Sequence, residues 1–252
     1  MLARRVEGVH VLSLVLLFAV SLGAGVLSGV VGTGSSIILL PILVWLYGPK
    51  AAVPAMAIAS VLANLARVIA WWRSINWRAV LAYSIPGMPA AALGAHTLLA
   101  LPPAVIDIAL SVFFIAMIPL RRLTERRRIR VRYWQLSVAG VSVGFLTGLV
   151  LSTGPLSVPI FTGFGLTGGA FLGTEAASSL TLYLSKITTF NQMGALPLGL
   201  VFRGLTIGAA LMLGAFIGKL IVLRVSTAWF HRAIDAVLIC AAGGLLITAF
   251  IK

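Results

Sequence analysis

Two basic residues, Arg67 and Lys186, stand inside long apolar stretches of this 252-residue chain, 119 residues apart. A cation within an apolar span is costly to bury and is by default a candidate for function. Arg67 is close to the Trp71-Trp72 pair, so its long side chain could instead extend to a membrane interface. We take both residues as candidates for holding an anion, and Lys186 as the stronger one because it lies well inside its span.

The 119-residue spacing also relates two glycine-rich stretches, GVLSGVVGTGSSIILLP and GFLTGLVLSTGPLSVP. Gly25 and Gly29 in the first correspond to Gly144 and Gly148 in the second, and for these four we favour close helix packing. Glycine, serine and proline are poor helix formers, so we expect one broken segment in each half. Irregular backbone within a membrane must be buried in protein or line a cavity, and two matching breaks predict a binding site between the halves.

Hydroxyls and free backbone N–H groups at such breaks suit an anion, although small residues there could also serve only packing. Ser60 and Ser179 repeat the 119-residue spacing, and Asn64 adds a polar group near Arg67. The predicted substrate-binding residues are Thr33, Gly34, Ser35, Ser36, Ser60, Asn64, Arg67, Thr153, Gly154, Ser157, Ser179 and Lys186.

The few acidic residues are expected to have structural roles. We expect Glu175 to start a span and to stabilise its helix end. Asp107 and Asp235 look like equivalents in the two halves, and helix-dipole stabilisation is favoured over a proton relay. The sequence has neither a Walker P-loop nor a His-Glu-x-x-His motif, so we expect no ATP-driven motor, no enzyme, no cofactor and no metal site.

The elements that position these residues follow from composition. Hydrophobic residues make up 60% of the chain and charged residues 10%. One membrane span needs about 20 helical residues. We expect an all-α polytopic membrane protein with about eight transmembrane helices, two short re-entrant or broken segments and two internal repeats. The repeats are residues 1–120 and 133–252, joined by a basic cytoplasmic linker at residues 121–132.

The expected spans are residues 9–31, 51–72, 79–99, 104–120, 133–152, 175–194, 203–223 and 227–251. The short helices are expected at residues 37–47 and, after a break at 154–159, up to residue 166. The net charge of +14 is interpreted as the positive-inside bias of a membrane protein, not as a nucleic-acid surface.

Orientation depends on whether the short helices return to the face from which they start. If they do, the cytoplasmic side collects both termini, the Arg73/Arg78 loop, the linker and the Arg203 turn, and the repeats are parallel. We prefer this arrangement. If the short helices cross fully, the Arg73/Arg78 loop lies outside, and inverted repeats also stay open.

Two glycine-rich stretches end in proline, a span with a serine and then a basic residue follows each, and turns stand at Trp77-Arg78 and Phe202-Arg203. This arrangement resembles the TauE/SafE sulfite exporter family, also called the toluene sulfonate uptake permease family. The family pattern often has three adjacent glycines, where this chain has Gly34-Ser35-Ser36 and Gly154-Pro155. The resemblance covers nearly the whole chain. It implies a bacterial or archaeal plasma-membrane transporter of small sulfur-containing anions such as sulfite, sulfoacetate or organosulfonates.

We therefore expect a secondary transporter that holds a small sulfur anion between the two breaks, driven by a proton or by the membrane potential. An uncoupled anion channel is the main alternative, and a membrane scaffold and an intramembrane hydrolase follow it. The expected partners are the anion, a coupling proton and the lipid bilayer, without nucleic acid. Gly-x-x-x-Gly pairs at Gly204/Gly208 and Gly214/Gly218 could serve packing within the chain or a homodimer.

Overall fold

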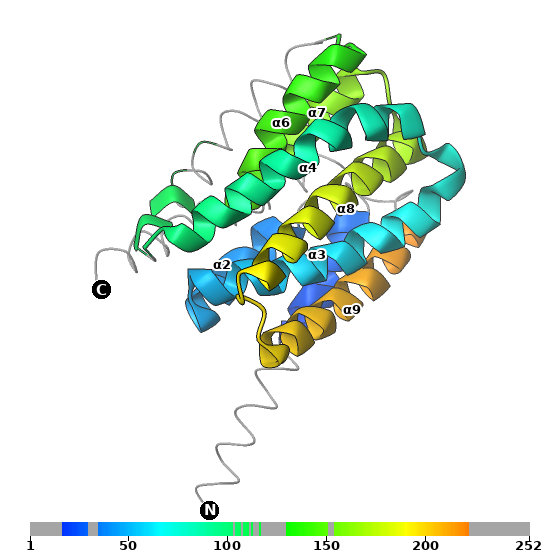
Figure 1. Ribbon diagram of the computed structural model, residues 1–252. Coiled ribbons are helices and arrows are strands. Elements are labelled where there is room, and N and C mark those ends of the chain that lie inside the picture. The colour runs from blue at the N-terminus through cyan, green and yellow to red at the C-terminus, as the bar shows by residue number, and fades with distance from the viewer. Residues whose placement is uncertain are drawn as a thin grey trace, which may run out of the picture.

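The computed structural model describes residues 17–29, 35–102, 130–150 and 154–221, with residues 104–106, 108–110, 112 and 116. Within these ranges it is helical and contains no strand, as expected for the all-α class (Figure 1). The helices are Leu17–Gly29, α2 (Ser35–Tyr47), α3 (Pro49–Trp71), α4 (Trp77–Ala100), α6 (Tyr133–Val150), α7 (Gly154–Gly163), α8 (Gly168–Gln192) and α9 (Leu198–Ile221), with a short 3-10 helix η1 (Trp72–Ser74). The last expected span and most of the basic linker lie outside the described residues.

Three predicted boundaries in the second half are wrong. Helix α9 begins at Leu198, so Arg203 lies inside this helix and not in a turn before it. Residues 154–159, predicted as a break, form the start of α7. Pro155 lies in its first turn, where a missing N–H costs no helical hydrogen bond. Helix α8 begins at Gly168, well before the predicted start at Glu175. The tight turn before it uses Gly165, whose φ of 99° favours glycine.

Close glycine contacts hold the helices together, as predicted for the Gly-x-x-x-Gly pairs. A Cβ on Gly25 would meet the Leu211 carbonyl oxygen of α9 at 2.5 Å. A Cβ on Gly144 would meet the Gly87 carbonyl oxygen of α4 at the same distance of 2.5 Å. Helix Leu17–Gly29 thus packs on α9, and α6 packs on α4.

The glycines of α9 also serve contacts within the chain. Gly204 and Gly208 lie against α3. Gly214 and Gly218 lie against the helix Leu17–Gly29. Both pairs that we considered for a homodimer are therefore occupied inside one subunit.

The helix directions define two ends of the bundle, which we call the Tyr47 end and the Trp71 end after the last residues of α2 and α3. The Arg203 guanidinium lies 4.7 Å from the centroid of the Tyr47 ring. The Lys219 Nζ lies 5.0 Å from the centroid of the Trp71 ring. Helix α9 is therefore parallel to α3. Helix α8 runs the other way, because Gly169 near its start packs against Trp71.

The expectation that Arg203 shares a side with Arg73 and Arg78 is wrong. Arg203 lies at the Tyr47 end, whereas Arg73 and Arg78 follow α3 at the Trp71 end. The reason is the direction of α7. Helix α6 runs toward the Tyr47 end, parallel to α4, and α7 returns the chain to the start of α6 at the Trp71 end before α8 begins. Helices α6 and α8 therefore run in the same direction, where opposite directions were expected, and Arg203 after α8 lies at the Tyr47 end.

The bundle has an apolar exterior and a partly polar interior. Leu198, Trp45 and Ile85 are 77%, 76% and 67% exposed. The buried polar side chains include Ser60, Asn64, Arg67, Glu175 and Lys186. Within the described residues, Pro49–Ser74 and Leu198–Leu220 are long and apolar enough to cross a membrane. This distribution suits a lipid surround, since an aqueous surround would favour polar residues outside and apolar residues inside.

Candidate functional site

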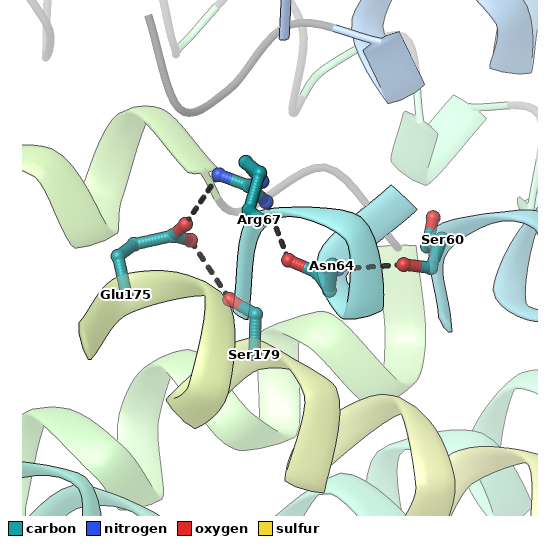
Figure 2. A network of polar contacts seen from close by, with 5 residues as sticks. All are labelled: Ser60, Asn64, Arg67, Glu175 and Ser179. Atoms are coloured by element: carbon teal, nitrogen blue, oxygen red, sulfur yellow. Dashed lines mark hydrogen bonds and ion pairs between the residues drawn. The ribbon is translucent and has the colours of Figure 1, made fainter. Parts of the chain in front are cut away.

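A buried polar network joins α3 and α8 (Figure 2). The Arg67 guanidinium donates to the Glu175 carboxylate, with 2.8 Å between Nη1 and Oε2. A second guanidinium nitrogen of Arg67 donates to the Asn64 side-chain oxygen. The other Glu175 oxygen accepts a hydrogen bond of 2.8 Å from the Ser179 hydroxyl. The network thus balances one positive charge with one negative charge in the interior.

Side chains of α3 and α8 meet in this way because of helical spacing. Asn64 and Arg67 lie three residues apart on α3, and Glu175 and Ser179 lie four apart on α8, so each pair shares one helix face. Asn64 is fixed in turn, because its Nδ2 donates to the Ser60 carbonyl at 2.7 Å. Three predicted residues, Ser60, Asn64 and Arg67, therefore lie along one face of α3, with Ser179 opposite them.

Lys186 has different surroundings. Its side chain is fully buried, and its Nζ donates to the backbone carbonyl of Thr147 on α6 at 2.7 Å. The same Nζ lies 5.4 Å from the centroid of the Phe190 ring. Thr147 lies near the C-terminal end of α6, and the C-terminal end of a helix attracts cations. Within the part of the chain that the structure describes, Lys186 forms no ion pair.

The two predicted cations do not form one site. Glu175, the partner of Arg67, precedes Lys186 by eleven residues on α8, a rise of roughly 16 Å. Glu175 lies about 10 Å along α8 from its start at the Trp71 end. Lys186 lies about 9 Å from the end of α8, on the opposite side of the bundle. A small oxyanion could therefore contact one cation or the other, but not both at once.

Two tyrosines connect this interior to the starts of the short helices. The Tyr183 hydroxyl lies close to Ser36 in the first turn of α2 and to Ser60 on α3. Tyr83 on α4 is close to Ser157 in the first turn of α7. Ser35 and Ser157 are buried at these helix starts. The predicted residues Thr33, Gly34 and Thr153 lie outside the described residues, and Gly154 is the first residue of α7.

Several interior hydroxyls have spare hydrogen-bonding capacity. Ser178 Oγ is buried and forms no hydrogen bond within the described part of the chain. Ser60 Oγ is also buried, and its neighbour is the Tyr183 hydroxyl. A buried hydroxyl without a partner is unfavourable, so such groups are places where a polar ligand or water would be stabilised. Chemically, the interior offers hydroxyl donors and two separate cations, which together suit a small anion.

Sequence reasoning missed Glu175 and Tyr183. Glu175 was expected at a helix end because the GLTGG stretch of Gly165 to Gly169 is typical of a loop. One signal was present in the sequence: Glu175 lies four residues before Ser179, a spacing that places the two on one helix face. Tyr183 stands 119 residues after Asn64, at the same spacing that relates Arg67 to Lys186.

Among the described residues, no cluster of His, Cys, Asp and Glu could hold a metal ion. Comparison with known families gives one match: the model described as "Sulfite exporter TauE/SafE" covers residues 17–245. A search of curated proteins and a search of solved structures found no match.

Proposed function

The chain belongs to the TauE/SafE sulfite exporter family, and on that premise we propose that it carries a small sulfur-containing anion across the cell membrane by alternating access. The family supports membrane transport of sulfur anions. We propose a sulfur oxyanion or organosulfonate, such as sulfite or sulfoacetate, as the substrate. We also propose secondary active transport without an enzymatic step, by a multi-pass protein of the plasma membrane.

The observation that carries this proposal is the pair of short helices that begin inside the bundle and run to opposite ends. Helix α2 runs from Ser35 to Tyr47. Helix α7 ends at Gly163, whose carbonyl accepts a hydrogen bond of 2.9 Å from the Val131 N–H beside the start of α6. Helix N-termini attract anions through their free N–H groups and dipole. An anion between Ser35 and Gly154 would be approached by both.

Two buried cations supply positive charge to the interior through which the anion would move. Lys186 lies toward the Tyr47 end without an acidic partner in the described residues, and Arg67 lies toward the Trp71 end beside Glu175. We assign Lys186 the role of attracting the anion into the interior. The hydroxyls of Ser36, Ser60 and Ser157 would complete its coordination. Alternating access then requires that the halves open the anion site to one end at a time.

The test is thermal unfolding of the detergent-purified protein with sulfite, sulfate, thiosulfate, sulfoacetate, taurine, phosphate and acetate. A ligand at 100 times its dissociation constant stabilises by about 2.7 kcal/mol. We expect a shift for sulfur anions that is lost in Lys186→Met. Saturable flux in proteoliposomes would favour a transporter over an anion channel. Equal shifts for all anions, or equal shifts in the variant, would argue against the assigned site.

A further inference from the structure

The charge of Arg67 is cancelled by Glu175, and this has a consequence for transport. An anion that approaches Arg67 also approaches a carboxylate 2.8 Å from the guanidinium. Resting on the function proposed above, we propose that Glu175 binds the coupled proton, and that its protonation releases Arg67 to hold the anion. Transport of the sulfur anion would then be coupled to movement of a proton in the same direction.

The arrangement of the two halves supports this role, because the acid occurs in only one of them. Position 56, which is 119 residues before Glu175, holds methionine. Lys186, at the position that matches Arg67, donates to a backbone carbonyl. A carboxylate is thus not a general requirement for burying a cation in this fold. Because Glu175 can be ionised or protonated, the Arg67–Glu175 pair has two charge states.

The Glu175 carboxylate is buried, so its charge acts strongly on the Arg67 guanidinium. The side chains of Arg67 and Glu175 are 7% and 3% exposed, so water screens the pair weakly. Oppositely charged groups in such a place hold each other strongly, and an anion competes with the carboxylate for the same guanidinium. Protonation removes this competition without moving the helix backbone.

The groups around Glu175 leave the proton few alternative binding places. Arg67 faces it from α3, Tyr83 from α4 and Tyr183 from its own helix. Helices α6 and α7, which also pack on α8, contain no Asp, Glu, Lys, Arg or His. The short helix η1 contributes Arg73, which is exposed. Among the described residues, Glu175 is the sole carboxylate.

The proposed step is balanced in charge. A proton from the aqueous phase joins the Glu175 carboxylate, and the ion pair with Arg67 breaks. One negative charge of the substrate replaces the lost carboxylate charge beside the guanidinium. When the anion leaves on the other side, Glu175 returns its proton to that side and the ion pair reforms. One proton therefore accompanies each anion.

Proteoliposomes with an internal pH-sensitive dye test this directly. Thiosulfate and methanesulfonate are suitable probes, because their own charge does not change between pH 5.5 and 8. For whichever probe is carried, we expect its inward flux to acidify the lumen, and an inward proton gradient to raise its uptake. Anion flux without any proton movement in the wild-type protein would overturn the proposal while leaving a transporter. Absence of flux for every anion tested would instead count against the proposed function.

Glu175→Gln sharpens the test, since the amide imitates the protonated acid. We expect this variant to retain exchange of labelled for unlabelled anion, to lose acidification, and to lose the dependence of flux on pH. Proton movement equal to that of the wild type would overturn the proposal. Thr188→Ala is the control, because it removes an exposed hydroxyl of the same helix that donates to the Leu184 carbonyl and does not contact Glu175. It should retain proton coupling. If Glu175→Gln does not fold, the wild-type proton measurement still decides.

Discussion

Arg67 and Lys186 stand 119 residues apart and are both buried, but they are stabilised in different ways. Arg67 has a carboxylate and an amide oxygen as partners. Lys186 has a backbone carbonyl at the end of α6 and an aromatic ring. The comparison separates two uses of a buried cation. The first carries a charge that a neighbouring carboxylate balances, and the second carries a charge without an acidic partner among the described residues.

Breaking the balanced pair should have the largest effect on stability. Arg67→Met leaves the Glu175 carboxylate buried without its partner, and removing one member of a buried ion pair costs about 3–5 kcal/mol. We expect thermal unfolding in detergent to show this loss. The double variant Arg67→Met/Glu175→Met removes both charges and should recover most of the stability. If the double variant were as unstable as the single one, the charge balance would not explain the pair.

Lys186→Met should separate stability from transport. Methionine leaves no charge behind, and the main loss is the hydrogen bond to the Thr147 carbonyl, about 1–3 kcal/mol. Anion flux should nevertheless fall at least tenfold, which corresponds to about 1.4 kcal/mol in binding free energy. Thermal unfolding and proteoliposome flux measured on one preparation provide the check. A stability loss as large as that of Arg67→Met would remove the distinction between the two cations.

The glycine contacts should be equally sensitive in both halves, because they do not depend on the cations. Gly25→Ala and Gly144→Ala each place a Cβ within 2.5 Å of a backbone oxygen. Such overpacking typically costs about 1–3 kcal/mol. Gly23→Ala is the control, since nothing lies within 4 Å of its added Cβ. The control should be neutral or slightly stabilising in thermal unfolding.

The smallest contrast is between the matching serines Ser60 and Ser179. Ser179→Ala removes a hydrogen bond to a charged group and should cost about 1.5 kcal/mol or somewhat more. Ser60→Ala removes a buried hydroxyl beside the uncharged Tyr183 hydroxyl, so its cost should be smaller than that of Ser179→Ala, whose partner is charged. Without ligand, equal losses for both variants in thermal unfolding would contradict the assigned hydrogen bonding.

The sequence was informative where spacing alone decides the outcome. The glycine pairs related by the 119-residue interval proved to be helix contacts, as their spacing predicted. It was also informative for α3 and α4, whose long apolar runs end at tryptophan, proline and arginine signals.

Prediction from the sequence failed where the outcome depends on the end of the bundle to which a helix runs. Whether Arg203 shares a side with Arg73 and Arg78 depends on whether α7 returns to the end where α6 starts, and local composition does not encode this. Glu175 was missed as the partner of Arg67 for a related reason. The ion pair joins residues 108 positions apart, and it requires that α8 run antiparallel to α3.

The most direct test of the central claim is uptake of radiolabelled sulfur anions into proteoliposomes by the wild-type protein and by Lys186→Met. The account predicts saturable uptake that unlabelled sulfite or sulfoacetate inhibits and phosphate does not, with at least a tenfold loss in the folded variant. Uptake that is unchanged in Lys186→Met, or the absence of wild-type uptake for every sulfur anion tested, would contradict it.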